Sequence, residues 1–426
     1  MSNTVTDELF NTAAIRSRCG NMLTAALADR SAHWRVDLAR LPECAREVAA
    51  LTRSRFPDLK IPYHSRWRHF EAGGVDRYAS WRQQMASASV AERARSEIDL
   101  AVVSVLLDAG AGAQWHYQER TTTTERPLTT ERIATAPKTA NIEQSFSRSE
   151  GLGLASWYLF LSGAFSGDIT QPWRADANGL IAITERTIEH GFQVDATNPL
   201  IGVAGRALLL NRLGAVIAKD PQRFGTPARP GGLFDRLTEH GAKKTIRAQD
   251  LLHEVLVGLA SIWPSENRID GHAVGDCWPH RLAGGSGTTQ GWVPIHKLSQ
   301  WLTYSLLEPF ERAGITVSGL DELTALAEYR NGGLLIDTGV IVARNPALLT
   351  QALSARDEAV IEWLALTVSL LDRLADEVRR ELSCSASQLP LARILEGGTW
   401  ATGRLLAQQR RDGLPPLNIV SDGTVF

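Results

Sequence analysis

Apolar residues recur at helical spacing through most of this chain, and that periodicity limits the possible folds more than any other feature. In residues 90–108 the apolar side chains fall on one face, which predicts an amphipathic helix that enters a core and ends near Gly110. Strand patterns are short, the best being residues 315–320 and 333–342. The sequence therefore predicts a mainly α protein, a multi-helix body with an irregular N-terminal lobe. Further helices are predicted over residues 7–30, 41–56, 150–166, 178–190, 199–218, 246–262, 356–382 and 389–411.

Residues 118–144 differ in kind from the segments on either side. They are rich in threonine, poor in apolar residues and contain two prolines, which favours a loop or extended excursion over a core element. The interpretation that follows is an N-terminal helical lobe over residues 1–117, a connector over 118–144 and a helical body over 145–426. One continuous domain over residues 1–426 is the alternative.

The composition is that of a soluble globular protein. Hydrophobic residues make up 44% of the chain and charged residues 22%, with a net charge of −2 and a pI near 6.6. Because phosphate neutralisation supplies most of the affinity for nucleic acid, this balance gives no reason to expect a nucleic-acid partner. No apolar run approaches membrane-spanning length, and the start lacks the pattern of a signal peptide. The four cysteines are far apart without a CxxC pair, which fits a reducing compartment, so a cytoplasmic protein is expected.

Residues 291–314 predict a helix with polar groups along one edge. Pro294 suits the first turn, where its missing N–H costs nothing, and Gly314 ends the helix. His296 and Gln300 are i,i+4 neighbours with Lys297 beside them, so three polar groups project near the edge of the apolar face.

The following segment predicts a second helix that ends at residues 331–333. Ser318 and Asp321 resemble a capping box at its start. Glu328 and Arg330 would then lie in its last turn, where a carboxylate meets the negative end of the helix dipole at a cost of about 0.3–1 kcal/mol. That cost invites a functional explanation, although a Glu–Arg pair at the end of an ordinary helical hairpin would give the same pattern.

Residues 61–77 are dense in functional groups between prolines and glycines, which favours a loop, and loops often carry sites. Arginine binds phosphate or carboxylate in a fork, and an adjacent tryptophan can stack on a planar group. A surface cluster of ion pairs is the alternative. The residues concerned are His64, Arg66, Trp67, Arg68, His69, Glu71, Asp76 and Arg77.

Residues 270–280 place His272, Asp276 and His280 at four-residue intervals, which on a helix would make a row of metal ligands. Glycines and a proline break that helix, so hydrogen-bonding roles for Asp276 and His280 are favoured and neither a metal nor a cofactor is expected. Trp292, like Trp67, lies in a predicted loop and is a candidate pocket wall. Arg148 and Glu150 lie at the start of a predicted helix and could face a pocket.

Several of these motifs together resemble the uracil catabolism protein 4 family, and the likeness runs from about residue 12 to residue 426. The motifs are HSRWRHFEAGGVDR, SRSEGLGLAS, VPIHKLSQWLTYSLLEP, LAEYRNGGLLID, GTWATGR and the terminal SDGTVF. The resemblance implies a role in a ring-opening route of pyrimidine breakdown, in which uracil is made into a nucleotide, opened to a ribosylurea and stripped of urea. It also implies association with other uracil-catabolism enzymes.

The segment KLSQWL…LDELTALAEYR…LLIDTGV is similar to part of the queuosine 5′-monophosphate N-glycosidases, which are related in fold to helix-hairpin-helix DNA glycosylases. In that family the acidic residue before Tyr-Arg serves catalysis. The resemblance implicates Lys297, Gln300, Glu328, Tyr329 and Arg330. This chain has Glu for Asp and Asn-Gly-Gly for Val-Pro-Gln, so the role of the acid could move to Asp337.

The two resemblances point to hydrolysis of the N-ribosidic bond of ribosylurea or its 5′-phosphate, a small anionic nucleotide-like substrate. Glu328 would be the catalytic carboxylate with Asp337 as its partner. Cations would hold the phosphate (Lys297, Arg330, Arg66 or Arg68), and Trp67 or Trp292 would pack the sugar or ureido plane. One alternative is a metal-dependent hydrolase using His64, His69, His272, Asp276 and His280, and another is a non-catalytic partner of the ring-opening enzyme.

Overall fold

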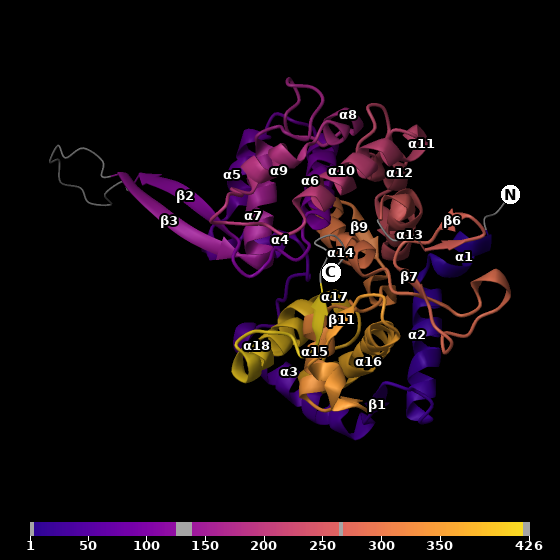
Figure 1. The fold of residues 1–426 in the computed structure, drawn as a ribbon. Helices are drawn as coiled ribbons and strands as arrows, with labels where there is room; N and C mark the ends of the chain where they lie inside the picture. Colours follow the sequence, from indigo (N-terminus) through magenta and orange to yellow (C-terminus); the bar gives the residue numbers. More distant parts are fainter. Residues whose placement is uncertain (1–3, 125–138, 264–266, 421–426) are drawn as a thin grey trace.

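The computed structural model describes residues 4–124, 139–263 and 267–420, and helices dominate it, which confirms the prediction of a mainly α protein (Figure 1). Many helices begin at a polar residue whose side chain accepts a backbone N–H, such as Asn11, Asp76 and Ser89. The helices are α1 (Thr4–Leu9), α2 (Thr12–Leu27), α3 (Leu41–Arg55), α4 (Trp67–Phe70), α5 (Arg77–Gln84), α6 (Val90–Leu106), α7 (Arg148–Leu161), α8 (Ala177–Ile181), α9 (Glu185–Gly191), α10 (Val203–Ile217), α11 (Pro221–Phe224), α12 (Gly232–Thr238), α13 (Ala248–Leu259), α14 (Lys297–Arg312), α15 (Tyr329–Asp337), α16 (Glu358–Leu382), α17 (Leu391–Ile394) and α18 (Trp400–Arg411).

Strands in the described part of the chain form only two-stranded pairs. Antiparallel pairs join β1 (Trp34–Val36) to β10 (Ile341–Ala343), β2 (His116–Thr124) to β3 (Thr139–Ser147), β5 (Arg268–Ile269) to β6 (His272–Ala273), and β7 (Cys277–Pro279) to β8 (Trp292–Pro294). Parallel pairs join β4 (Thr245–Arg247) to β9 (Thr316–Ser318) and β11 (Ala352–Ser354) to β12 (Asn418–Val420). Several pairs connect segments far apart in the sequence, so they act as ties between helices.

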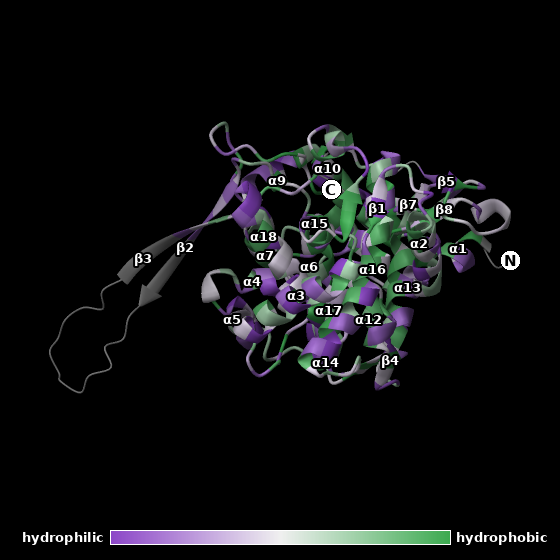
Figure 2. Cartoon of the chain, turned by 90° about the horizontal axis from the view of Figure 1, so that it is seen from below, coloured by the Kyte–Doolittle hydropathy of each residue, from purple (hydrophilic) through white to green (hydrophobic). Residues whose placement is uncertain are grey.

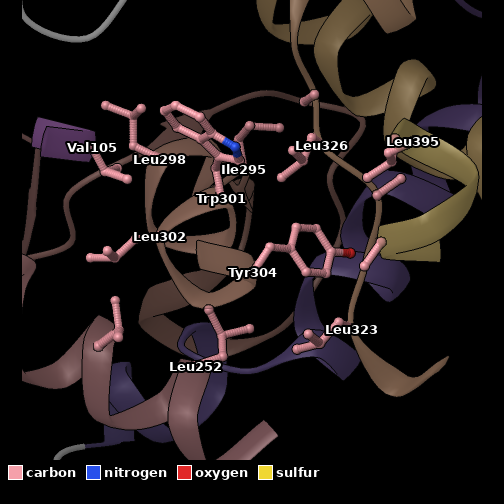
Figure 3. Close-up of a cluster of buried hydrophobic side chains, with 14 of the residues drawn as sticks. Val105, Leu252, Ile295, Leu298, Trp301, Leu302, Tyr304, Leu323, Leu326 and Leu395 are labelled. Carbon is pink, nitrogen blue, oxygen red and sulfur yellow. The ribbon is translucent and has the colours of Figure 1, made fainter. Parts of the chain in front are cut away.

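Helix α14 lies at the centre and packs against α6 and α13. Its apolar side chains, including Trp301 and Tyr304, meet Leu323 and Leu326 of the following segment in one buried cluster (Figure 3). The N-terminal helices α2 and α3 pack against α16, so the first helices share their core with the last ones (Figure 1). Polar residues lie mainly on the outward faces of the helices (Figure 2). The likeness to helix-hairpin-helix glycosylase folds stays a prediction.

The threonine-rich stretch expected as a loop or extended excursion contributes two paired strands. β2 and β3 project from the helical body as an antiparallel ladder (Figure 1), and the middle of the stretch, residues 125–138, lies outside the described residues. Gln193 anchors the base of this ladder, because its side chain both accepts from the N–H and donates to the carbonyl of Gln118.

The prediction of a second helix that begins after Ser318 and ends at residues 331–333 is wrong. The chain instead forms β9, a short 3-10 turn η5 (Leu320–Glu322) and an extended run to Glu328, and only then α15. Side chains of α14 hold the extended run, since the Tyr304 hydroxyl donates to the Thr324 carbonyl over 2.5 Å. Ser318 lies in β9 and caps nothing, so the capping box is absent. Likewise Pro294 lies in β8, and α14 starts three residues later at Lys297.

The two glycines expected to stop that helix lie inside α15. Neither Gly332 nor Gly333 has a positive φ. A Cβ on Gly332 would lie 2.4 Å from the Trp363 ring, so this glycine lets α15 approach α16. Gly403 plays the same part from α18, because its Cβ would lie 2.1 Å from the carbonyl oxygen of Arg330. These glycines therefore pack helices together and do not end one.

Among the described residues, no helix combines the length and apolar character that crossing a bilayer requires.

Candidate functional site

Four segments that are distant in sequence bring charged side chains to the N-terminal end of α15. They are the loop before α4 with His64, the β7–β8 region with Asp276, the start of α14 with Lys297, and the start of α15 with Glu328. Lys297 lies close enough to Asp276 and Glu328 for their charges to interact, and His64 interacts in the same way with Glu328. The structure therefore brings together residues that the sequence predicted from separate motifs.

Glu328 is the N-cap residue of α15. Its carboxylate accepts the N–H of Arg330 over 2.8 Å and also the N–H of Asn331. The prediction that it ends a helix is wrong, and so is the expected conflict with the helix dipole. A carboxylate at this position meets the positive end of the dipole and satisfies two N–H groups, both of which stabilise it. The carboxylate is thus held in one orientation by backbone atoms.

Burial opposes that stabilisation. It raises the pKa of Glu328 above the ordinary value, although the two N–H donors and the positive charges of His64 and Lys297 pull the pKa back down. Burial also lowers the pKa of Lys297, against the negative charges of Asp276, Glu328 and Asp108. These opposite shifts bring an acid and a base closer together in proton affinity, which is a feature of functional sites.

The same groups keep contact with solvent. Asp276, Lys297 and Glu328 are half-buried, and Tyr329 is 39% exposed although burial raises its pKa. These four residues therefore form a charged cluster at the N-terminal end of α15 that protein covers in part and solvent still reaches, here termed the recess, with Tyr329 at its exposed edge.

Asp276 fixes the start of α14. Its Oδ2 accepts the backbone N–H of Lys297 over 2.8 Å, and its Oδ1 accepts the indole N–H of Trp278 over 2.6 Å. Asp276 was predicted to have a hydrogen-bonding role, and these contacts show one. Trp292, half-buried in β8, pairs with Pro279 in the same ladder.

Arg66 is fully buried, and its guanidinium group binds other side chains of the protein. Its Nη1 lies 3.2 Å from Asp108 Oδ1, and its Nε donates to the Ser104 hydroxyl over 2.6 Å. The neighbouring predicted residues point elsewhere. Arg68 pairs with Glu71 and Glu308 at 3.1 and 2.7 Å, and the buried Trp67 ring lies against the guanidinium of Arg312, whose central carbon is 4.1 Å from the ring centroid.

Three further predicted residues support the backbone around the recess. Gln300 accepts a hydrogen bond from the Thr324 hydroxyl and donates to the Ile295 carbonyl over 3.0 Å, which ties α14 to the run that leads to Glu328. The buried Arg330 donates to the Gly413 carbonyl over 3.1 Å. His296 faces the other way: its ring meets the edge of Phe10, and burial lowers its pKa to about 4.

Asp337 is not part of this cluster. It lies at the opposite end of α15, about 13 Å along the axis from Glu328 by helical rise. Both of its oxygens accept from the guanidinium of Arg411, over 2.8 and 2.6 Å. This pair ties α15 to α18.

Sequence reasoning missed Glu396 and Asp108. Glu396 lies in a π-helical segment, η7 (Leu395–Thr399), between α17 and α18, and its Oε2 is 2.9 Å from Nδ1 of His64. π-Helical turns are rare and occur frequently at functional sites, but a one-residue insertion leaves no clear trace in apolar spacing. Asp108 follows α6 and looked like an ordinary helix end.

At the rim, Arg148 is exposed, and its positive charge acts on Tyr329. Glu150, named with Arg148 in the sequence, instead pairs with Arg404 over 3.0 Å. Arg148 is therefore a cation at the mouth of the recess.

The proposed metal ligands do not gather. Within residues 4–124, 139–263 and 267–420, no three His, Cys, Asp or Glu side chains form a group that could hold a metal ion. His64 contacts Glu396, whereas His280 lies 3.4 Å from Glu358.

A mainly helical protein with a recessed, charged site around a capping glutamate is thus defined. The family model described as "Protein of unknown function (DUF1688)" matches residues 8–426, and the chain belongs to that family. The chain is 35% identical to "Uracil catabolism protein 4" of Lachancea kluyveri over 92% of each chain. It is 34% identical to "Protein urg3" of Schizosaccharomyces pombe over the full length of both. The resemblance to the uracil catabolism protein 4 family is confirmed.

Proposed function

We propose that this protein acts in uracil catabolism and hydrolyses the N-ribosidic bond of ribosylurea or its 5′-phosphate, releasing urea. The pathway is suggested by the name of the relative that is 35% identical. The reaction is suggested by Glu328, a half-buried carboxylate that backbone donors hold in place in a recess that also holds Lys297 and Asp276.

Cleavage of a C1′–N bond builds positive charge on the sugar, in an oxocarbenium-like transition state. A fixed carboxylate stabilises that charge most effectively when it needs no reorganisation during the reaction, and the two N–H groups that cap onto Glu328 meet this requirement. Because burial raises its pKa, Glu328 is also a better proton acceptor than a solvated glutamate, which suits it to orient the attacking water.

The anionic part of the substrate calls for cations near the recess. Lys297 lies beside Glu328, and Arg148 lies exposed near Tyr329 at the mouth. Arg66 is fully buried and Arg68 pairs with two glutamates, so these two guanidinium groups are less accessible to a ligand. We assign the phosphate, where present, to Lys297 and Arg148.

The test is urea release from N-ribosylurea and from its 5′-phosphate by the purified protein, with a metal chelator present. Wild type should release urea from at least one substrate, and Glu328→Gln should lose about 10²–10³ of the rate, as expected for one electrostatic group at the transition state. Asp337→Asn is the matched control on the same helix and should keep its activity. A folded wild type that releases no urea from either substrate would overturn the proposal.

A further inference from the structure

A buried imidazole–carboxylate pair stands beside the proposed carboxylate. His64 and Glu396 are 7% and 8% exposed, and Nδ1 of His64 lies 2.9 Å from Oε2 of Glu396. Within the described part of the chain, Nε2 of His64 has no hydrogen-bond partner, and it is not among the atoms sealed from solvent. One ring nitrogen is thus engaged by the protein and the other is left available.

Both members of the pair are held by the backbone. The N–H of His64 donates to the Ala392 carbonyl over 2.8 Å, and Arg55 donates to the Glu396 carbonyl over 2.6 Å while reaching its carboxylate at 3.5 Å. The π-helical turn that displays Glu396 is packed closely on α3, since a Cβ on Gly398 would lie 2.4 Å from Val48. The backbone that carries both side chains is therefore fixed in place.

The charges around the pair favour one proton arrangement. Burial alone would raise the pKa of Glu396, but the hydrogen bond and charge of His64 and the charge of Arg55 bring it below the ordinary value. An ionised carboxylate accepts, so Nδ1 carries the hydrogen and Nε2 is the nitrogen that can gain or lose a proton. The charge of His64 also acts on Glu328 at the start of α15 and on His69 of α4.

We propose that His64 protonates the departing urea nitrogen through Nε2, with Glu396 as its positioning residue. This inference rests on the proposed function and names the donor which that reaction needs. Lacking a proton, the urea nitrogen is a poor leaving group, and proton donation by a placed side chain contributes about 10²–10⁴ to such rates. The turn η7 that carries Glu396 packs against α15, and the charge of His64 acts on Glu328, so the donor and the charge-stabilising carboxylate lie on neighbouring elements.

The steps balance as a hydrolysis. The C1′–N bond breaks, its electron pair goes to nitrogen, and that nitrogen takes the proton from Nε2 of His64, which leaves urea and a sugar cation facing Glu328. Water then adds to C1′, and its proton passes to Nε2, either directly or by way of Glu328. The products are urea and ribose or ribose 5-phosphate, and His64 is again protonated.

The test compares leaving groups. His64→Gln should lose about 10²–10⁴ of kcat/KM on ribosylurea, yet less than about tenfold on 4-nitrophenyl riboside, whose leaving group departs without a proton. Glu328→Gln should lose activity on both. Glu396→Gln should lose about 10–100-fold on ribosylurea, because the imidazole loses the partner that orients it. Glu311→Gln is the control. Glu311 accepts a hydrogen bond over 2.8 Å from the hydroxyl of Tyr63, the residue before His64, but Glu311 itself lies outside the site.

A second measurement does not depend on turnover. Nitrogen-15 NMR of the histidine rings, with His64 assigned by its absence in His64→Gln, should show the hydrogen of neutral His64 on Nδ1 in wild type and a mixture of tautomers in Glu396→Gln. Urea release by wild type together with full activity of His64→Gln would overturn this inference and leave the proposed function intact. Absence of urea release by wild type would remove the proposed function, and the NMR result would still decide whether the pair exists.

Discussion

Replacing Gly332 by alanine tests whether the paired glycines of α15 pack helices or end one. The added Cβ would lie 2.4 and 2.5 Å from two carbons of the fully buried Trp363 ring and 2.8 Å from the hydroxyl of Thr367. Ordinary contact begins near 3.4 Å, so α15 and α16 must separate by about 1 Å. Overpacking of this kind costs about 1–3 kcal/mol, while alanine returns up to about 1 kcal/mol of helix propensity. A net loss of about 1–2 kcal/mol is expected.

Gly333→Ala is a control one residue away in the same helix. Its Cβ would meet only the Pro416 ring, at 3.1 and 3.4 Å, which a slight shift of the proline relieves. The propensity gain should then offset the contact, leaving the free energy of unfolding within about 0.5 kcal/mol of wild type or slightly above it.

Thermal and denaturant unfolding of the two variants provide the assay. For a chain of this size about 1 kcal/mol corresponds to 1–2 °C, so Gly332→Ala should lower Tm by about 1–4 °C and Gly333→Ala should leave it nearly unchanged. Gly332→Ala should also reduce urea release under the proposed function, because the displaced helix carries Glu328 at its N-cap. Equal stability of the two variants, or no loss in Gly332→Ala, would refute the packing account.

Three further predictions concern the site and its supports. Urea release should fall as the pH is lowered and Glu328 is protonated. Because burial raises the pKa of that carboxyl above its ordinary value of 4.5, the midpoint of the kcat/KM profile should lie above pH 4.5. A midpoint at or below pH 4.5 would contradict this. Asp337→Asn should lower the free energy of unfolding by about 1–3 kcal/mol by weakening the charged hydrogen bonds to Arg411, with activity kept within a few-fold, whereas a hundredfold loss would make Asp337 the catalytic carboxylate. Thr324→Val should cost about 1 kcal/mol by removing the donor to Gln300, and denaturation curves identical to wild type would show that this bond contributes nothing.

The amphipathic helices could be predicted because their apolar spacing records the face that each one buries. The predicted helices over 90–108 and 356–382 correspond to α6 and α16 within a few residues at each end. The spacing failed at residues 323–328, where Thr324 is held in an extended run because its hydroxyl donates to Gln300 and its carbonyl accepts from Tyr304, both on α14. Local helix propensity takes no account of hydrogen bonds to another helix, and here these bonds override it.

The candidate site was predicted in part for a related reason. The sequence predicted His64, Asp276, Lys297 and Glu328 as site residues in separate motifs. The fold places them around one recess. The role of Glu328 as an N-cap was missed because Asn-Gly-Gly reads equally well as a helix stop or as a close helix crossing. Glu396 was missed because a π-helical turn rotates a side chain to another face of the helix, and the neighbouring sequence does not reveal this rotation.

The packing of α2 and α3 against α16 has a consequence for synthesis of the chain. Arg16 on α2 bonds Asp372 on α16 over 3.0 Å, across a separation of 356 residues. At about 5–20 residues per second, a ribosome makes the second partner roughly 20–70 s after the first. Throughout that interval the apolar faces of the N-terminal helices lack their native cover, which makes the nascent chain a substrate for chaperones. In a chain released before α16 is made, α2 and α3 would lack the helix against which they pack.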